Sequence, residues 1–286
     1  MRRWMTVAII ILLIAIVAAA ITWFLANQSY RSRVAEAEAA WSDIVSRATA
    51  PSKVYTPELV ADLPEIAQRY FNHAIAPGTP LATTVELTME GTFILGDAAS
   101  PQPFAMSARQ VLAPPNEFVW IAEMTSGPMH VGGADMLHED QASMRFWLFQ
   151  SIPLVQSAAS EGLDRSAAAR PALEAIWAPA SLLPPNGVAW EQLAADKARV
   201  TFTSGKWPTE MVMTIGEDGR LLDIVAMRWS DANPDKTFRL QPFGGTMEAE
   251  AEFGGYTIPS LVHVGNNYED ESYFPFFNAT ITGATY

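Results

Sequence analysis

The densest group of metal-binding side-chain types in the sequence comprises His130, Asp135, His138, Glu139 and Asp140. A metal ion could use this group, because imidazole and carboxylate groups suit zinc or manganese. The chemistry would then be metal-assisted hydrolysis, with His130, Asp135 and His138 as candidate ligands. The alternative, and the commoner arrangement, is a polar hairpin turn at the sequence HEDQ, because acidic residues are frequent in turns.

Motifs for other reaction classes are missing from the sequence. There is no G-x-S-x-G turn for a serine nucleophile, no H-E-x-x-H, and no Walker or dinucleotide-binding glycine motif. Four histidines are too few to nominate a catalytic triad from spacing. The chain has no cysteine, which excludes thiolate metal sites, a cysteine nucleophile and disulfides. We therefore expect no cofactor.

Aromatic and methionine side chains are abundant, with 9 Trp, 14 Phe and 12 Met. Their usual place is a packed core. A curved sheet of about a dozen strands, however, cannot be filled by two short helices alone, so some of them could line a groove for an acyl chain or other apolar ligand. The residues predicted for this groove are Trp120, Trp147, Trp177, Trp229, Arg109 and Arg145.

Several charged residues fall within predicted strands: Arg109, Glu123, Arg145, Glu210 and Arg228. On the solvated face of a sheet they would be ordinary surface charges, which is the commoner arrangement. On the inner face they would instead form a polar network able to hold the head group of a ligand.

The elements that position these residues are mostly strands, because the hydrophobic period changes to two from Thr83 onward. The turn dipeptides Asp218-Gly219 and Gly254-Gly255 predict tight hairpins, so the strands that they join must be antiparallel. An Ala-rich helical insert at 157–185 interrupts the pattern. The predicted strands are 83–93, 104–111, 118–124, 129–137 and 143–149 before the insert, and 188–193, 198–203, 211–215, 221–229, 237–241, 246–253, 256–264 and 273–282 after it.

Two helices are predicted before the sheet, over 29–47 and 57–71. The first carries an apolar stripe at Val34, Ala37, Trp41 and Ile44 that could pair with a partner helix. More often, a stalk of this kind is a solvated extension of a membrane helix. The predicted fold is therefore mainly β (α+β), a large curved antiparallel sheet or half-barrel with a helical insert.

The segment from Trp4 to Leu25 has 22 residues and no charge, which is long enough to cross a bilayer. A cleaved signal peptide is the alternative, but the apolar run continues past the small residues Ala18 to Ala20. We expect a single-pass anchor, with residues 4–25 in the membrane. Basic residues flank both ends, so the charge rule barely decides orientation; the short basic N-terminal tail favours a domain outside the cytoplasm.

Composition and length limit the possible partners and the domain organisation. With 18 basic and 31 acidic residues the net charge is -13, which argues against a nucleic-acid partner. Apolar residues make up 49% of the chain, enough for a core. The predicted organisation is an anchor at 1–28, a stalk and linker at 29–56, and one domain at 57–286.

Three stretches, LPEIAQRYFNHAIAPGTPL, EAIWAPASLLPPNGVAWE and FGGYTIPSLVHVG, resemble an uncharacterised bacterial family, DUF6544 (formerly DUF6920). The resemblance runs from about Leu63 to Tyr286. It departs at Phe277-Asn278-Ala279, where the family pattern has an aromatic residue followed by Arg-Gly, so no role for that arginine is carried over. The element order is also similar to the lipoprotein carrier fold of the LolA and LolB type, in which a curved antiparallel sheet wraps over a helical lid.

Three functional hypotheses remain open from the sequence. The first is a membrane-anchored module that binds a lipid or other apolar ligand between sheet and helices. The second is a hydrolase that uses the cluster at 130–140. The third is a structural or assembly factor of the bacterial envelope, whose protein partner is not indicated by any residue pattern.

Overall fold

A computed structural model describes residues 2–157, 160–203 and 206–286. Its helices are α1 (Arg2–Arg47), α2 (Glu65–Ala74) and α3 (Glu161–Leu173), with 3-10 segments at Pro57–Val60, Glu174–Trp177, Pro179–Leu182 and Pro184–Asn186. Its strands are β1 (Val85–Leu95), β2 (Gln102–Ala113), β3 (Glu117–Ser126), β4 (Met129–His138), β5 (Gln141–Leu148), β6 (Ile152–Gln156), β7 (Val188–Gln192), β8 (Lys197–Phe202), β9 (Thr209–Ile215), β10 (Leu221–Ser230), β11 (Arg239–Phe253), β12 (Tyr256–Asn266) and β13 (Phe274–Thr285).

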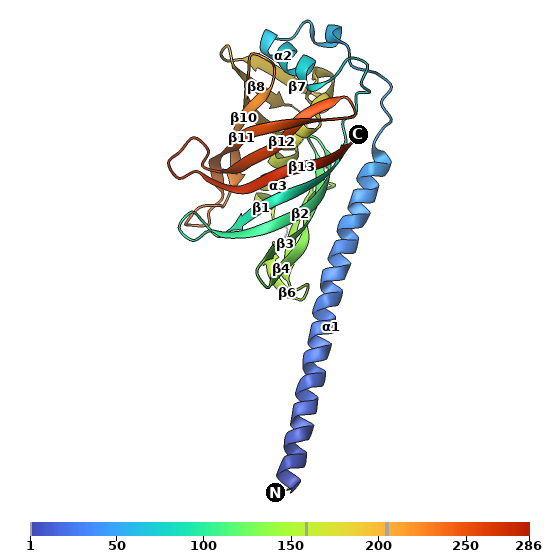
Figure 1. The fold of residues 1–286 in the computed structure, drawn as a ribbon, viewed down its shortest axis with the longest axis vertical. Helices are drawn as coiled ribbons and strands as arrows, with labels where there is room; N and C mark the ends of the chain where they lie inside the picture. Colours follow the sequence, from blue (N-terminus) through green and yellow to red (C-terminus); the bar gives the residue numbers. More distant parts are fainter. Residues whose placement is uncertain (1, 158–159, 204–205) are drawn as a thin grey trace.

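These strands form one curved antiparallel sheet (Figure 1) with the order β6-β5-β4-β3-β2-β1-β13-β12-β11-β10-β9-β8-β7. The first and last strands, β1 and β13, pair at its centre. Each half of the sheet is a meander of neighbouring strands, because consecutive strands joined by short loops pair locally. The predicted mainly β fold with an antiparallel curved sheet is confirmed.

Two strand predictions were wrong: one strand was split in two and another was missed, so the number of strands is unchanged. β11 is a single strand, although the sequence pattern split it at 242–245. Gly244 and Gly245 do not turn the chain: a Cβ on them would lie 2.1 Å from the Ile224 carbonyl oxygen and 1.9 Å from that of His263, so they allow close approach of neighbouring strands. β6 was missed because it is short and contains Pro153, which an edge strand tolerates.

The face of the sheet covered by α3 is called the concave face here. α3 contacts β3, β4 and β5 of the first half and β9 and β10 of the second, so it bridges the two meanders. Its first turn is capped by Ser160, whose Oγ accepts a hydrogen bond from the Leu163 backbone N–H at 3.2 Å. The main hydrophobic core lies between this face and the insert.

The opposite, convex face is covered by the C-terminal half of α1. Ala37, Ala40 and Ile44 are buried against β-strand residues that include Val111 and Val119. The expected solvated stalk, or a stalk paired with a partner helix, is thus corrected: the stripe packs on its own domain. β2 and β3 carry apolar side chains on both faces, and the convex ones need a cover.

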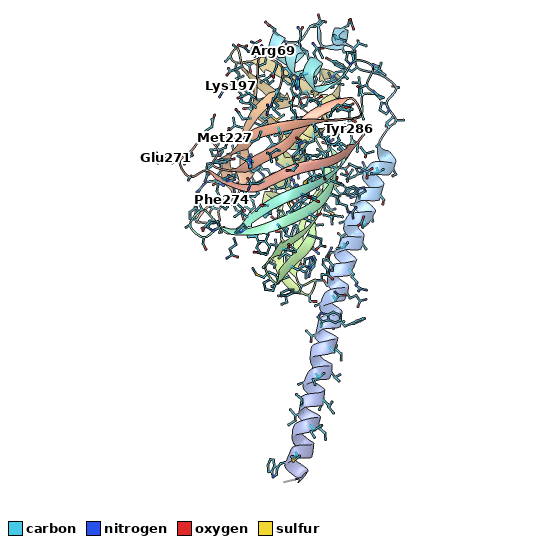
Figure 2. All side chains as sticks on the ribbon, viewed as in Figure 1. Arg69, Lys197, Met227, Glu271, Phe274 and Tyr286 are labelled. Carbon is cyan, nitrogen blue, oxygen red and sulfur yellow. The ribbon has the colours of Figure 1, made fainter. Side chains whose placement is uncertain are left out.

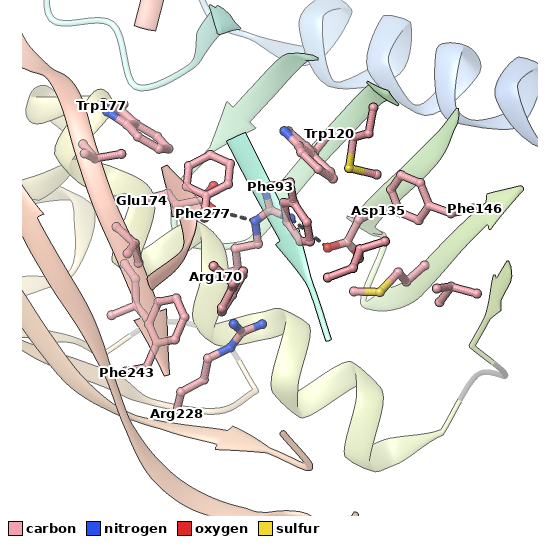
Figure 3. A pocket seen from close by; sticks show the side chains of 18 of the residues that line it. Phe93, Trp120, Asp135, Phe146, Arg170, Glu174, Trp177, Arg228, Phe243 and Phe277 are labelled. Atoms are coloured by element: carbon pink, nitrogen blue, oxygen red, sulfur yellow. Dashed lines mark hydrogen bonds and ion pairs between the residues drawn. The ribbon is translucent and has the colours of Figure 1, made fainter. Parts of the chain in front are cut away.

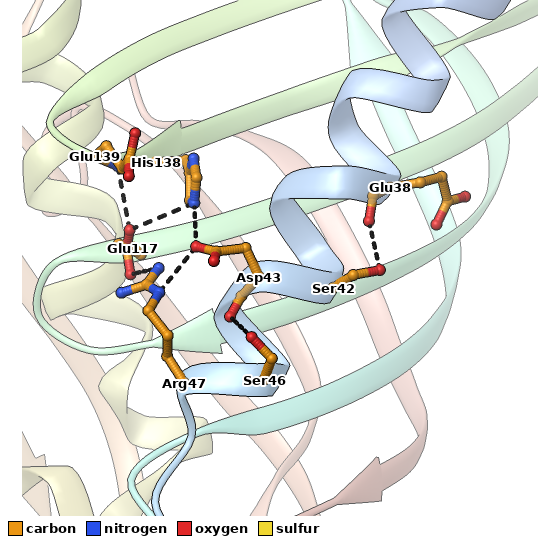
Figure 4. Close-up of polar contacts among 8 residues, drawn as sticks. All are labelled: Glu38, Ser42, Asp43, Ser46, Arg47, Glu117, His138 and Glu139. Carbon is orange, nitrogen blue, oxygen red and sulfur yellow. Dashed lines mark hydrogen bonds and ion pairs between the residues drawn. The ribbon is translucent and has the colours of Figure 1, made fainter.

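Ion pairs hold the end of α1 on the convex face (Figure 4). Asp43 pairs with Arg47 and with His138 of β4, each at 2.8 Å. Arg47 also reaches Glu117 of β3 at 2.7 Å. These contacts place the last turn of α1 beside the start of β3 and the end of β4.

The N-terminal part of α1 extends away from the domain (Figure 1). Within the described residues, α1 is the one helix long and apolar enough to cross a membrane, and the side chains of its apolar window are not buried. The helix meets the domain at Tyr30, whose hydroxyl hydrogen-bonds Glu123 at 3.0 Å. From Tyr30 onward, α1 runs along the convex face.

The two ends of the sheet differ. At one end, Tyr286 stacks on Tyr256 with ring centroids 4.0 Å apart and its hydroxyl donates to the Trp177 carbonyl at 2.8 Å, which closes that end. The other end is formed by the hairpin loops that follow β1, β3, β5, β10 and β12. Figure 2 shows Tyr286 at the first end and Phe274 at the second.

Candidate functional site

A cavity of ≈ 200 Å³ lies between the concave face and α3. Its walls are mostly aromatic, aliphatic and methionine side chains from both halves of the sheet and from the insert. They include Phe93, Trp120, Phe146, Trp177 and Phe277. The volume exceeds the ~150 Å³ of an apolar protein cavity known to bind benzene, so a small apolar group fits inside (Figure 3).

The cavity lies toward the hairpin-loop end of the sheet. Its lining residues reach from the middle of the sheet to that end, where they include Phe93 and Leu95 near the end of β1 and Phe276 and Phe277 near the start of β13. Leu154 and Val155 of the edge strand β6 also line it, and Leu154 is exposed to solvent. The cavity therefore adjoins the surface at β6, whereas Trp177 and Tyr286 close the opposite end.

Arg170 of α3 organises the polar part of the cavity. Its guanidinium donates to Glu174 at 2.6 Å, to Asp135 of β4 at 2.7 Å and to Gln110 of β2 at 3.1 Å. The Gln110 amide in turn donates to Glu174 at 2.6 Å. The same guanidinium lies 4.4 Å from the centre of the Phe118 ring. All three Arg170 nitrogens are thus paired, which is what a buried cation requires.

Burial sets the titration of this network. It raises the pKa of Asp135 above its ordinary value, because a desolvated carboxylate loses hydration, while Arg170 and Arg228 act in the opposite direction. For Arg170, burial acts to lower the pKa, but Glu174 and Asp135 outweigh it and the pKa is raised. Asp135 is therefore the member of this pair that takes up a proton as the pH falls, and Arg170 stays charged.

Arg228 of β10 is the second cation on the cavity wall. Its guanidinium lies 4.9 Å from the centre of the Phe243 ring. Among the residues that the structure describes, no carboxylate lies within 4.0 Å of it and no hydrogen-bond partner reaches its enclosed Nε atom. Burial, and then repulsion by Arg170, lowers its pKa.

The structure brings two of the six predicted groove residues, Trp120 and Trp177, to the cavity. Arg109 and Trp147 lie on the convex side, where Arg109 pairs with Glu38 and Trp147 packs edge-on against Tyr30 at 5.6 Å. The alternation of β2 and β5 explains this placement, because successive side chains point to opposite faces.

The other two predicted groove residues are also elsewhere. Arg145 lines a small gap between α1 and the convex face. Trp229 stacks on Phe238 and lies under the Arg165 guanidinium, which is 4.0 Å from its ring centre. Arg228 is one of the strand charges considered from the sequence, and it does face inward and line the cavity.

The candidate metal ligands do not form one set. Asp135 points into the cavity toward Arg170, whereas His130 pairs with Glu123 at 2.7 Å and His138 with Asp43 at 2.8 Å on the convex side. Within the described ranges, no group of three metal-binding side chains is close enough to hold an ion. The odd and even positions of β4 separate these residues, because they face opposite ways.

Sequence reasoning missed Arg170, Glu174 and Gln110 as site residues. A signal was present, since Arg170 and Glu174 are four positions apart in the predicted helical insert and can pair along one face. Gln110 had no such signal: only the sheet register places its fully buried side chain opposite α3.

The family model described as a family of unknown function, DUF6544, matches residues 53–279. The chain belongs to this family. The resemblance drawn from its three sequence stretches is therefore confirmed. No curated protein matches the chain.

Solved structures with a similar fold include three bacterial proteins. A LolA superfamily protein from Nitrosomonas europaea is 9% identical, with a TM-score of 0.38, covering 77% of this chain and 90% of its own. A putative outer membrane lipoprotein-sorting protein domain from Vibrio parahaemolyticus is 10% identical, with a TM-score of 0.37 and coverage of 80% and 91%. A DUF1329 family protein from Desulfovibrio piger is 8% identical, with a TM-score of 0.40 and coverage of 78% and 90%.

Proposed function

We propose that this protein is a membrane-anchored binding module that holds a lipid or other apolar ligand in the cavity between the concave face and α3. The observation that carries the proposal is the cavity itself, ≈ 200 Å³ of mostly apolar space bridging two halves of a sheet that is otherwise well packed. Apolar pockets with a few converging polar groups are typical of sites for small apolar molecules.

The anchor in this proposal is the N-terminal part of α1. Residues 4–25 form a single membrane pass, and the domain at 57–286 lies outside the cytoplasm. The exposed apolar side chains from Trp4 to Leu25 support this arrangement, because leaving so many of them in water would be unfavourable. The segment at 29–56, whose helical part packs along the convex face, then joins the membrane to the rest of the domain.

The test compares lipid bound by the full chain with lipid bound by a variant whose cavity is filled. Val264 lines the cavity, so Val264→Trp reduces its volume. Leu222→Trp is the matched control, since Leu222 is an exposed residue of β10. Mass spectrometry of organic extracts should show a lipid species in the wild type and in the control that is lost from Val264→Trp. Membrane lipid carried over with α1 contributes equally to all three, so identical extracts would refute the proposal.

A further inference from the structure

We propose that Arg228 binds the head group of an anionic single-chain amphiphile, through carboxylate or phosphate oxygens, while the chain occupies the apolar cavity. This inference deepens the function proposed above and rests on it. It assigns a charge to the ligand, an orientation within the cavity and one residue that discriminates charged from neutral ligands.

The first argument is the contrast between the two cavity arginines. Arg170 has an acceptor for each of its three nitrogens, at 2.6, 2.7 and 3.1 Å. Arg228 has no side-chain hydrogen bond and no carboxylate within 4.0 Å in the described parts of the chain. Asp135 and Glu174, the two carboxylates of the cavity wall, already accept from Arg170.

The second argument is the cost of leaving such a group alone. A guanidinium stays charged in proteins. The Arg228 residue is half-buried and its Nε atom is enclosed without an acceptor, and leaving such a donor unpaired is unfavourable. Burial does act against the charged form of Arg228, since it lowers its pKa. An oxyanion at this position would supply the missing acceptor, and the planar guanidinium fork can bind two oxygens of a carboxylate or phosphate at once.

The third argument is the place of Arg228 in the cavity. It lies two positions before the end of β10, at the hairpin-loop end of the sheet, whereas Trp177 lies toward the closed end. Figure 3 shows Arg228 across the cavity from Trp120 and Phe146. If the charged head group of a ligand binds Arg228, its apolar chain can therefore lie against the apolar wall formed by residues such as Trp120 and Phe146.

The experiment measures binding of three probes of equal chain length by the full chain in nanodiscs. The probes are bromine-labelled decanoate, decyl phosphate and decanol, and the signal is quenching of tryptophan fluorescence, to which Trp120 and Trp177 contribute from the cavity wall. A Trp120→Phe chain identifies the cavity part of the signal, because quenching by probe dissolved in the bilayer persists without it.

We expect at least one charged probe to bind about tenfold or more tightly than decanol, because a hydrogen bond to a charged group contributes about that much. Preference for decanoate would indicate a carboxylate head group, and preference for decyl phosphate a phosphate. Arg228→Gln should abolish the preference without weakening decanol, and Arg228→Lys should retain part of it. Arg165→Gln, a change to another arginine outside the cavity wall, should leave it intact.

Two results would overturn the inference, and they are distinguishable. If decanol binds but charged probes gain nothing, or if their gain survives in Arg228→Gln, the cavity binds apolar ligands and Arg228 plays no part. If no probe gives quenching that depends on Trp120, the proposed function fails as well.

A different observation carries a second inference: we infer that the β5–β6 hairpin contacts the membrane that holds α1. Phe149, Ile152 and Leu154 of this hairpin are exposed, at 48%, 54% and 48%. Phe149 lies in the turn between β5 and β6. Its φ is +51°, an unfavourable conformation for a bulky residue.

The path of α1 indicates where this hairpin lies relative to the bilayer. Tyr30 contacts Trp147, two residues before Phe149, and lies five positions after Leu25 in the helix. At 1.5 Å per residue this is about 8 Å, similar to the ~5–8 Å thickness of one headgroup layer. β5 ends at Leu148, so the hairpin tip lies just beyond Trp147, and Figure 1 shows the neighbouring β6 at the end of the domain from which the N-terminal part of α1 extends. In this proposal the apolar tip therefore reaches the bilayer surface. The cavity, lined by Leu154, then opens beside the membrane.

The absence of native cysteine makes this arrangement easy to test. Phe149→Cys and Ile152→Cys, each carrying an environment-sensitive fluorophore, should report an apolar environment and quenching by spin-labelled phosphatidylcholine in vesicles. Leu59→Cys is the control, because Leu59 is exposed to a similar degree, 47%, in the 3-10 segment beside α2 at the other end. Equal, water-like signals at all three positions would overturn the inference.

Discussion

The two faces of the sheet are covered by helices that fit them very differently. On the convex face, Ala37 and Ala40 let α1 approach so closely that the gap beside it measures ≈ 10 Å³. On the concave face, α3 is joined to the sheet through the Arg170 network, and the contact leaves ≈ 200 Å³. Small side chains permit close packing, whereas a buried ion network needs room for its geometry.

This difference assigns a separate role to each face: the convex contact attaches α1, and the concave contact provides space for a ligand. The convex contact is tight, uses small residues and ends in exposed ion pairs, which suits a fixed joint between α1 and the domain. The concave contact joins both halves of the sheet at a few polar points and leaves apolar space between them.

The largest effect is expected from removing the guanidinium that holds α3. Arg170→Ala leaves Asp135 and Glu174 buried without their cation, although Gln110 still donates to Glu174, so it should lower the free energy of unfolding by about 3–5 kcal/mol. Arg165→Ala, on the same helix, removes only a cation–π contact with Trp229 and should cost about 1 kcal/mol or less. Denaturant unfolding followed by tryptophan fluorescence measures both. Equal losses would show that α3 is not held by this network.

The second prediction compares enlargement on the two faces. Ala37→Leu overpacks the convex contact and should cost about 1–3 kcal/mol. Val264→Phe also adds volume, on the concave face, but the cavity can accept it, so the cost should be below about 1 kcal/mol. The same unfolding measurement applies. If the concave variant were the less stable one, the cavity would be closed in solution.

The third prediction concerns pH and the convex contact. Burial, aided by Glu123, raises the pKa of Tyr30 from its ordinary value of 10 to about 12. The docked helix therefore keeps a proton that the undocked helix loses above pH 10. Docking should be unaffected below pH 10 and weaken by up to about tenfold per pH unit between 10 and 12.

Hydrogen exchange of residues 31–47 measures that change, and Tyr30→Phe provides its control. The phenylalanine variant cannot ionise at this position, so its exchange should show a smaller dependence on pH over the same range. If both chains responded alike, other groups would control the docking of α1.

The smallest effect is expected at the exposed ion pairs of Figure 4. Arg47→Ala removes contacts to Asp43 and Glu117, but the arginine is half exposed. Solvent screens such pairs, so unfolding midpoints of the two chains should agree within error at moderate salt. A large, salt-dependent loss would mean that charge, rather than close packing of the alanines, attaches α1.

Much of the fold could be read from residue order. The period of two in Val85, Leu87 and Met89 reports one buried face, and all three are buried here. Prediction failed at 242–245, where β11 continues through Gly244 and Gly245 because these glycines allow close approach of neighbouring strands. It also failed for the stalk, because the stripe on α1 does not reveal which surface covers it.

The site was less predictable than the fold. Trp120 and Trp177 were expected at the cavity and lie there, but Arg109, Arg145 and Trp147 face the other way. Composition supplied the right residue types, and the face of each strand was the missing information. A shift of one position in a strand moves a side chain to the opposite surface.

By itself, the sequence determined the local and additive properties: an apolar N-terminal helix, antiparallel strands, an acidic chain and membership of DUF6544. Only the tertiary structure decided which residues meet. It brought Arg170 to Asp135, left Arg228 without an acceptor within 4.0 Å in the described residues, and placed α1 on the convex face. The reason is physical, since these contacts join residues far apart in the chain and depend on sheet register and curvature, which no short stretch of sequence encodes.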